Sequence, residues 1–410
     1  MVDIARVREL SAAVESMVET YAQDSSTENY KQLQTAVSRL QIAAASPVDT
    51  LFSFRLKVGI SLLHRTLVIG NIAVTMAMEL GVIDALVALG QDQAHAVDLA
   101  AATGCEQGII ERLLRVACGL GICDEVDENT YRATEVTRLL VQPGWKAAMS
   151  QMDLIYPLAS NARQYLSTTP AYREKQPPVS GATLFEYVHG KSMWQVLADN
   201  PDIRQNFDLW MSEQRRNEEE TSWQRRYPPS THLKPDNLKA GPEAVLMVDV
   251  GGAHGSQLVN FRSQFPLLPG QCVLQDLPES VGSFTNPPEH IKVMAYNFFT
   301  PQPIKGARFY YFRNVFHNWS DAKCIDILRN LVPAMDPDYS SVLIDDYVLP
   351  PTGAPLRSAI ADVLMLIHFN SSERTSSHYQ QLLAAAGLDL VAVYPKGPNE
   401  EAIIEARRWW

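Results

Sequence analysis

The stretch AVLMVDVGGAHGSQLVNF, residues 244–261, decides the fold of the C-terminal half of the chain. It begins with a short, valine-rich apolar run, which is typical of a strand buried on both faces of a parallel sheet. A glycine-rich turn follows and leads directly into a helical segment. This order lets the backbone approach a ligand and leaves free N–H groups at the helix N-terminus. The stretch therefore predicts a Rossmann-like unit with a ligand site at the turn.

Four further apolar runs support the same fold. They are separated by helical stretches, and strands alternating with helices indicate a doubly wound α/β sheet. We therefore predict one α/β domain over residues 236–410. The runs are QCVLQ (271–275), IKVMA (291–295), ARFYYF (307–312) and SVLIDDYVL (341–349).

The N-terminal part, residues 1–145, is predicted to be a helical arm followed by a winged helix. The arm, residues 1–60, is either solvated or part of a dimer interface. Residues 67–89 are almost wholly apolar, so they must pack in a core or against a second subunit. The second helix of the winged-helix pattern carries only Arg112 and Arg115 as basic residues, too few to bind a phosphate backbone. The sequence of this part therefore favours a structural or dimerisation role over DNA binding.

Residues 146–235 are predicted to be a helical linker rich in aromatic side chains. Large flat side chains suit a pocket for a planar organic substrate, although core packing explains them nearly as well. The candidates for substrate contact are Met152, Tyr156, Phe185, Trp194 and Trp210, with Met365 from the C-terminal domain.

The composition limits the possible partners. Of the 410 residues, 46% are hydrophobic and 20% charged, which is typical of a folded, multidomain enzyme. The formal net charge of −11 disfavours nucleic acid and anionic lipid. The N-terminus lacks the continuous apolar core of a signal peptide or a spanning helix. The five cysteines show no paired spacing, so we expect neither a disulfide framework nor a zinc site. Together these features predict a cytoplasmic enzyme without membrane contact.

Two neighbouring strand ends indicate the kind of cofactor. The dinucleotide fingerprint GxGxxG is not satisfied, because Gly251, Ala253 and Gly255 follow a DxGxAxG pattern resembling the form that methyltransferases use. About 20 residues later the second strand ends at Asp276, whose carboxylate can accept hydrogen bonds from both ribose hydroxyls. Asp276 could instead cap the following helix. We favour ribose binding, because both strand ends then serve one ligand.

His317 is the candidate base. It follows the fourth strand, on the side where open α/β sheets bind ligands. The fifth strand reaches Asp345 and Asp346, and Glu373 precedes a later helix. Carboxylates from two elements could orient and charge-stabilise one imidazole, as a base requires. Because Asp345 and Asp346 alternate faces of a strand, they cannot both bind one ion, and we expect no metal.

The chain resembles the plant caffeate-type and fungal O-methyltransferases over essentially its full length. The motifs VDVGGAHG, QDLP, FRNVFHNWSD, DDYVLP and ERT occur in the family's order. The resemblance implies a class I methyltransferase domain preceded by a winged-helix dimerisation domain, a homodimer, S-adenosylmethionine as cofactor and a small-molecule substrate. It implies His317 as general base, with Asp346, Glu373 and Arg313 as the other catalytic residues. The implied cofactor-binding residues are Asp249, Gly251, Gly252, Gly255, Asp276, Leu277, Asn297, Phe298 and Arg313.

Three departures from the family pattern bear on the site. Asn297 stands where the family commonly has aspartate, so adenine recognition would use an amide. Asp346 replaces the glutamate of plant members and shortens the reach to His317 by one methylene group. Ala253 and His254 replace glycine-rich choices in the turn.

We predict O-methyl transfer to a phenol or enol of a polyketide-like fungal metabolite. A second enzyme class stays open, because some fungal proteins resembling this family keep the cofactor yet catalyse dehydrations or pericyclic ring closures. Arg313, Asn314 and His317 could serve either chemistry. A third possibility, a DNA-binding regulator that senses the cofactor, would require a basic surface, and the net charge argues against it.

Overall fold

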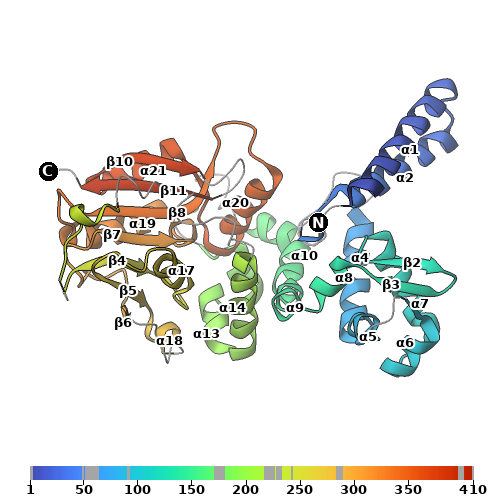
Figure 1. Cartoon of the computed structure of the whole chain (residues 1–410), viewed down its shortest axis with the longest axis horizontal. Helices are drawn as coiled ribbons and strands as arrows, with labels where there is room; N and C mark the ends of the chain where they lie inside the picture. Colours follow the sequence, from blue (N-terminus) through green and yellow to red (C-terminus); the bar gives the residue numbers. More distant parts are fainter. Residues whose placement is uncertain are drawn as a thin grey trace. The chain divides into compact units, whose positions relative to one another are not determined.

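The computed structural model describes residues 3–48, 50, 64–89, 93–169, 181–216, 227, 233–241, 243–282, 290–395 and 401–408 (Figure 1). The chain forms two compact units: unit 1 contains Met1–Asp153 and Asp202–Gln214, and unit 2 contains Leu154–Pro201 and Arg215–Trp410. The sequence-based division at residues 145 and 235 stays a prediction.

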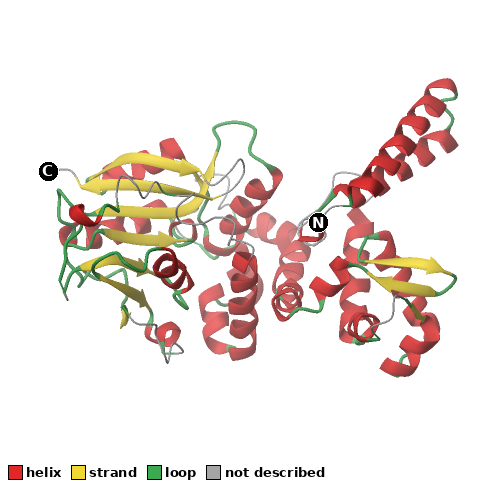
Figure 2. Ribbon diagram, in the orientation of Figure 1, coloured by secondary structure: helices red, strands yellow, loops and turns green. Residues whose placement is uncertain are grey.

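The described part of unit 2 is built on one eight-stranded sheet (Figure 2). The strand order is β10-β11-β8-β7-β4-β5-β6, and the short β9 pairs with β8. The pairs among β4, β5, β6, β7 and β8 are parallel, whereas β11 is antiparallel to both β8 and β10. The predicted α/β fold is therefore confirmed, with an antiparallel edge added. The strands are β4 (Val245–Val250), β5 (Gln271–Asp276), β6 (Ile291–Ala295), β7 (Phe309–Arg313), β8 (Ser341–Leu349), β9 (Arg374–Thr375), β10 (Leu388–Pro395) and β11 (Glu401–Arg408).

Helices pack on both faces of this sheet. Successive side chains of β7 point to opposite faces, and each set lies in a core shared with helices. Tyr310 and Phe312 share a core with α19 (Asp321–Leu331) and α21 (Ser376–Ala385). Phe309 and Tyr311 face the opposite core, which includes α17 (Ser256–Gln264). Every residue of β7 is buried, which explains its uninterrupted apolar run. The remaining regular elements of this unit are α12 (Leu184–His189), α13 (Met193–Asp199), η2 (Pro235–Asn237), α18 (Pro278–Val281), η3 (Phe316–Asn318), η4 (Val332–Ala334) and α20 (Leu356–Phe369).

Unit 1 contains the predicted winged helix. A three-stranded sheet has the order β1-β3-β2; β1 precedes the helices α6 and α7, whereas β2 and β3 follow them as a hairpin that turns at Asn129, whose φ is 51°. Glu106 caps α7 by accepting hydrogen bonds from the N–H groups of Gly108 and Ile109. The elements are α4 (His64–Glu79), α5 (Val82–Ala88), β1 (Ala94–His95), α6 (Ala96–Thr103), α7 (Gln107–Gly119), β2 (Cys123–Asp127), β3 (Thr130–Ala133), α8 (Glu135–Leu140), α9 (Pro143–Ser150) and α14 (Pro201–Arg216), with α10 (Met152–Thr168) beginning at the unit boundary.

The apolar stretch 67–89 is two helices, because Gly81, with φ of 72°, breaks it between α4 and α5. Among the described residues no single helix is long and apolar enough to cross a membrane. The pair Val68–Glu79 and Val82–Ala88 together has the length and apolar composition of a span, but the two helices are bent by 61° relative to each other. Val74, Ala77 and Ile83 of this pair lie in the core of unit 1.

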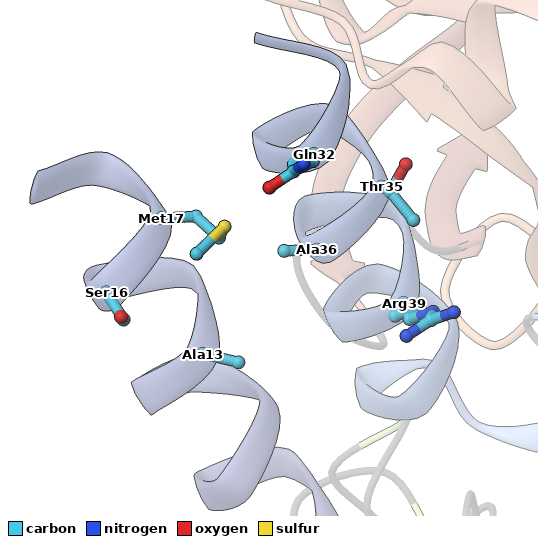
Figure 3. Close-up of a pocket in the computed structure, with 7 residues that line it drawn as sticks. All are labelled: Ala13, Ser16, Met17, Gln32, Thr35, Ala36 and Arg39. Atoms are coloured by element: carbon cyan, nitrogen blue, oxygen red, sulfur yellow. The ribbon is translucent and has the colours of Figure 1, made fainter. Parts of the chain in front are cut away.

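The N-terminal arm is a hairpin of α1 (Ile4–Gln23) and α2 (Thr27–Ala44) (Figure 1). Asp3 and Ser26 cap the two helices through their side chains. Leu10 is the buried residue of α1, and no described residue of α2 is fully buried. A groove of about 470 Å³ runs between the helices, lined by Ala13, Ser16, Met17, Gln32, Thr35, Ala36 and Arg39 (Figure 3).

Candidate active site

The glycine-rich turn after β4 is held close to the end of β5. Gly251 adopts a φ of 77°, and its N–H donates a 2.7 Å hydrogen bond to the carbonyl of Gln275. A Cβ atom on Gly251 would lie 2.9 Å from Val315 Cγ2, and one on Gly252 would lie 2.5 Å from Asp249 Cγ. Both positions therefore require glycine, because a larger residue would push the turn away from the sheet.

Asp276 ties the two strand ends together. Its Oδ2 accepts a hydrogen bond from the Ala253 N–H at 2.9 Å, and its Oδ1 accepts one from the Leu277 N–H at 2.7 Å. Leu277 is the N-cap of α18, which has no side-chain capping hydrogen bond. The alternative role of Asp276 as a helix cap therefore has no support from the geometry. Its carboxylate also stabilises Ala253 in its left-handed conformation, with φ of 48°.

Asn297 and Phe298 follow β6 at the same end of the sheet. Asn297 Oδ1 accepts a 3.0 Å hydrogen bond from the Phe299 N–H, so the amide stabilises its own turn. Phe298 Cε1 lies 3.9 Å from the position of a Cβ on Gly251. Its ring also contacts Phe299 and Trp319, with centroid separations of 5.0 and 5.9 Å.

This end of the sheet fits a nucleoside cofactor. The turn leaves no room for side chains at Gly251 and Gly252, and Gly255 begins α17 with φ of 68°. A carboxylate at the end of β5 and an aromatic ring beside the turn suit a ribose and a flat base. Asp249 is buried in β4 directly below the turn, so it shapes the backbone there.

His317 and Glu373 form a close pair. His317 lies in η3, a single 3₁₀ turn after β7, and its Nδ1 is 2.9 Å from Glu373 Oε1. The His317 side chain is 14% exposed, whereas that of Glu373 is 1% exposed. Because Nδ1 is engaged by the carboxylate, Nε2 is the nitrogen left to exchange a proton with a substrate.

The electrostatics of His317 are set by carboxylates. Burial lowers the pKa of the imidazole, but Glu373, by its charge and hydrogen bond, raises it, as do the charges of Asp346 and Glu401. The result is a pKa of about 9. These carboxylates therefore favour the protonated imidazole at neutral pH, and His317 becomes a base as the pH rises.

Asp346 supports His317 by its charge. It is fully buried, and its Oδ2 accepts a 2.9 Å hydrogen bond from the hydroxyl of Tyr379 rather than from His317. Burial raises the pKa of Asp346 to about 7, with the charge of Glu373 adding to the effect. Asp346 thus acts on His317 through its charge, and Glu373 is the carboxylate in direct contact.

Arg313, at the end of β7, belongs to a second charge cluster. Its Nη2 donates to Glu401 Oε2 at 2.8 Å, and its Nε is 3.7 Å from Asp345 Oδ2. Tyr311 also donates to Asp345, and Asn314 donates to Glu401 at 3.4 Å. The guanidinium is buried, so these carboxylates balance its charge inside the protein.

The predicted substrate residues fall into two groups. In unit 2, Phe185 packs on His368 with ring centroids 5.2 Å apart, and Trp194 stacks on Phe369 at 5.3 Å. Both partners lie on α20, the helix that carries Met365, and the partly buried Tyr156 lies on α10 of the same unit. Met152 and Trp210 belong to unit 1, where Trp210 is a core residue 5.3 Å from the ring of Trp145.

Three further residues shape the site and were missed by sequence reasoning: Tyr379, Glu401 and Arg374. Tyr379 gave no signal, because it is one of several apolar residues in its helix. Glu401 lies in β11, an antiparallel strand between β8 and β10, and is 87 or more residues from its partners Arg313 and Asn314. Arg374 stood within the ERT motif, next to Glu373. In the described ranges, no group of three or more His, Cys, Asp or Glu residues is arranged to hold a metal ion.

Comparison with known proteins gives consistent matches. Residues 169–389 match the family model of the O-methyltransferase domain, and residues 69–143 match that of the O-methyltransferase dimerisation domain. Demethylsterigmatocystin 6-O-methyltransferase of Aspergillus flavus is 32% identical over 74% of this chain and 76% of its own length. O-methyltransferase lepI of Aspergillus flavus is 29% identical over 94% of this chain and 96% of its own.

Solved structures agree with these matches. The structure of LepI in complex with SAM has a TM-score of 0.77 and 27% identity, covering 98% of this chain and 100% of that chain. A structure described as a pericyclic reaction enzyme matches with the same TM-score, identity and coverage.

Proposed function

The chain belongs to the O-methyltransferase family, whose cofactor is S-adenosylmethionine, and we propose that it methylates a phenol or enol hydroxyl of a fungal, polyketide-like metabolite with His317 as general base. The observation that carries this proposal is the 2.9 Å contact between His317 Nδ1 and Glu373. It fixes the ring and leaves Nε2 to accept the hydroxyl proton. The relative named for demethylsterigmatocystin, a 32% identical O-methyltransferase, supports the substrate class.

The cofactor would be held by the strand ends of unit 2. Gly251, Gly252 and Gly255 would admit its methionine part, the Asp276 carboxylate its ribose, and Asn297 and Phe298 its adenine. Asp249, Leu277 and Arg313 would support this site from the carboxyl ends of β4, β5 and β7. When bound, the cofactor supplies an electrophilic methyl group on a cationic sulfur. The protein's own contribution is to exclude water, orient the substrate and take its proton.

The proposed base predicts an alkaline pH profile. The neutral form of His317 is the active one, and the neighbouring carboxylates raise its pKa to about 9. kcat/KM should therefore rise with pH, with a midpoint near 9, since this parameter reports groups of the free enzyme. Glu373→Gln removes the main charge that raises the pKa, so its midpoint should move to lower pH. The exposed Asp389→Asn serves as control and should keep the wild-type midpoint. Equal midpoints for wild type and Glu373→Gln would contradict the pairing.

We also propose that the enzyme is a cytoplasmic homodimer. Residues 69–143 match the dimerisation domain, and α4 carries a stripe of apolar side chains exposed in the single chain: Val68 (51%), Ile69 (60%), Ile72 (45%) and Met76 (45%). Such a stripe at helical spacing is typical of an interface. All five cysteines are free thiols, which supports a reducing compartment.

The dimer predicts a specific effect of charge on α4. Ile72→Glu should convert the protein to monomers at micromolar concentration, because a buried, unpaired charge at an interface is costly. Leu267→Glu, at an apolar position of unit 2 that is 93% exposed, should leave the mass unchanged. Light scattering after size-exclusion chromatography measures both. A wild-type protein of single-chain mass would contradict the dimer itself.

One observation favours a second candidate function. The Glu373 carboxylate, 2.9 Å from His317 Nδ1, raises the pKa of the imidazole and favours its cationic form, and a cationic imidazole can polarise a carbonyl by hydrogen bonding. The similarity to a pericyclic reaction enzyme is compatible with this chemistry. A pericyclase or dehydratase would then convert its substrate without consuming the cofactor. The two functions differ in the sign of the pH dependence, because the second loses activity as His317 is deprotonated.

A further inference from the structure

The turn that carries His317 is short and needs support from outside. Its own hydrogen bonds within η3 and its flanks run from Asn318 N–H to Val315 O and from Trp319 N–H to Phe316 O, each at 3.1 Å. A single 3₁₀ turn has poor hydrogen-bond geometry and little stability alone. The direction of the His317 ring therefore depends on what packs against the turn.

Arg374 binds both ends of this turn. Its Nη1 donates to the carbonyl of Phe316 at 2.9 Å, and its Nη2 donates to the carbonyl of Trp319 at 2.7 Å. Its Nε donates to Asp321 at 2.9 Å, where α19 begins. The Arg374 side chain is fully buried, so its bonds to the two backbone carbonyls are shielded from bulk water, whereas the Asp321 side chain is 48% exposed. One guanidinium thus spans the residues on either side of His317 and Asn318.

The residues before Arg374 act on the same turn. Ser371 Oγ donates to the carbonyl of His317, and Glu373 contacts the His317 ring. Arg374 itself pairs with Val348 of β8, which fixes its backbone to the sheet. Segment 371–374 therefore contacts the turn in three ways: Ser371 binds its backbone, Arg374 binds its two ends, and Glu373 binds the imidazole.

We propose that Arg374 is a positioning residue that holds His317 in contact with Glu373 by fixing both ends of the 316–319 turn. This inference rests on the proposed role of His317 as base. A displacement of about 1 Å at a catalytic group can cost about 100-fold in rate, so loss of the guanidinium should act on kcat. The expected effect is therefore on kcat and on its pH dependence.

The test is Arg374→Ala with chemical rescue. A pocket of about 230 Å³ is lined by Arg374, Asp321, Asp362, Ser371 and His378, together with Ser320, Leu366 and Ser372, so a small cation can enter the vacated site. We expect kcat to fall about 100-fold and to recover in millimolar guanidinium but not in urea, which lacks the charge. We also expect the pH midpoint to move toward the ordinary histidine value of about 6.5, as His317 leaves Glu373.

Arg374→Lys keeps the charge and tests the geometry if the alanine variant folds poorly. A lysine ammonium cannot match the planar fork, so we expect about a tenfold loss of kcat and a lower pH midpoint. The matched control is Arg329→Ala, since Arg329 is exposed and also donates to a backbone carbonyl, that of Ala385. Folded Arg374 variants with wild-type kcat and pH midpoint would overturn the proposal. So would a loss of activity that guanidinium leaves unchanged.

His317→Ala, measured in parallel, distinguishes failure of the Arg374 proposal from failure of the proposed base role of His317. If His317→Ala is inactive while folded Arg374 variants retain full activity, the positioning role is wrong and the base assignment survives. If His317→Ala itself retains activity, the base assignment is wrong.

Discussion

Replacing His317 with alanine is expected to reduce methyl transfer by a factor of about 10² to 10⁴, the usual contribution of a general base. Cofactor affinity should stay unchanged, because no residue of the glycine turn contacts the His317 ring among the contacts described above. The loss should appear in kcat and in kcat/KM alike, since the proton moves in the transition state. Single-turnover rates with labelled cofactor, together with calorimetric cofactor binding, measure the two quantities.

The alanine variant also leaves Glu373 buried without its partner, so its stability must be checked. His317→Gln provides the companion variant, because its amide can still donate to Glu373 but cannot act as a base at neutral pH. His95→Ala, which lies in unit 1 at the start of α6, is the control and should retain full activity. Retention of more than about a tenth of the rate in folded His317→Ala would exclude the general-base role.

Removal of the Asp276 carboxylate is expected to weaken cofactor binding by about 1 to 3 kcal/mol, the cost of leaving charge-assisted hydrogen bonds unmade. Two effects contribute. The ribose loses its acceptor, and the Ala253 and Leu277 N–H groups lose the carboxylate that holds them. Equilibrium binding of S-adenosylmethionine to Asp276→Ala measures the sum.

Asp276→Asn divides the two effects, because the amide keeps one oxygen for the backbone but presents an N–H₂ group on its other side. We expect it to lose affinity as well, though less than alanine does. Glu279→Gln, three residues further on and exposed, is the matched control. Unchanged affinity in folded Asp276→Ala would contradict ribose binding and leave Asp276 as a structural residue of the turn.

Local patterns were enough to predict the sheet and the glycine turn. Buried strands such as β7 are uninterrupted apolar runs, and Gly251 and Gly252 are required by contacts within a few residues or across one strand pair. The alternation of Asp345 and Asp346 also held: Asp345 meets Tyr311 on one side, and Asp346 meets Tyr379 on the other. Successive side chains of a strand point to opposite faces of the sheet, so the separation of these two carboxylates could be predicted without knowing which residues they contact.

The partners themselves depend on long-range packing, which no local pattern encodes. Tyr379 lies 33 residues from Asp346, and Glu401 lies 88 residues from Arg313. The sequence named both Asp346 and Glu373 as carboxylates supporting His317, but it could not show that Glu373 makes the hydrogen bond while Asp346 bonds to Tyr379. Among the aromatic residues, periodicity could not separate Trp210, a core residue of unit 1, from Trp194, which is 39% exposed in unit 2.

An O-methyltransferase consumes its cofactor, and we expect this enzyme to do so. Incubation with S-adenosylmethionine labelled in its methyl group, together with fungal phenols, enols and unsaturated polyketide-pyridones, tests it by mass spectrometry. Methyl transfer should give a product that carries the labelled methyl and an equal amount of S-adenosylhomocysteine. A cofactor that binds but remains unconsumed, while a substrate isomerises or loses water, would contradict methyl transfer and assign the site to the pericyclase or dehydratase chemistry.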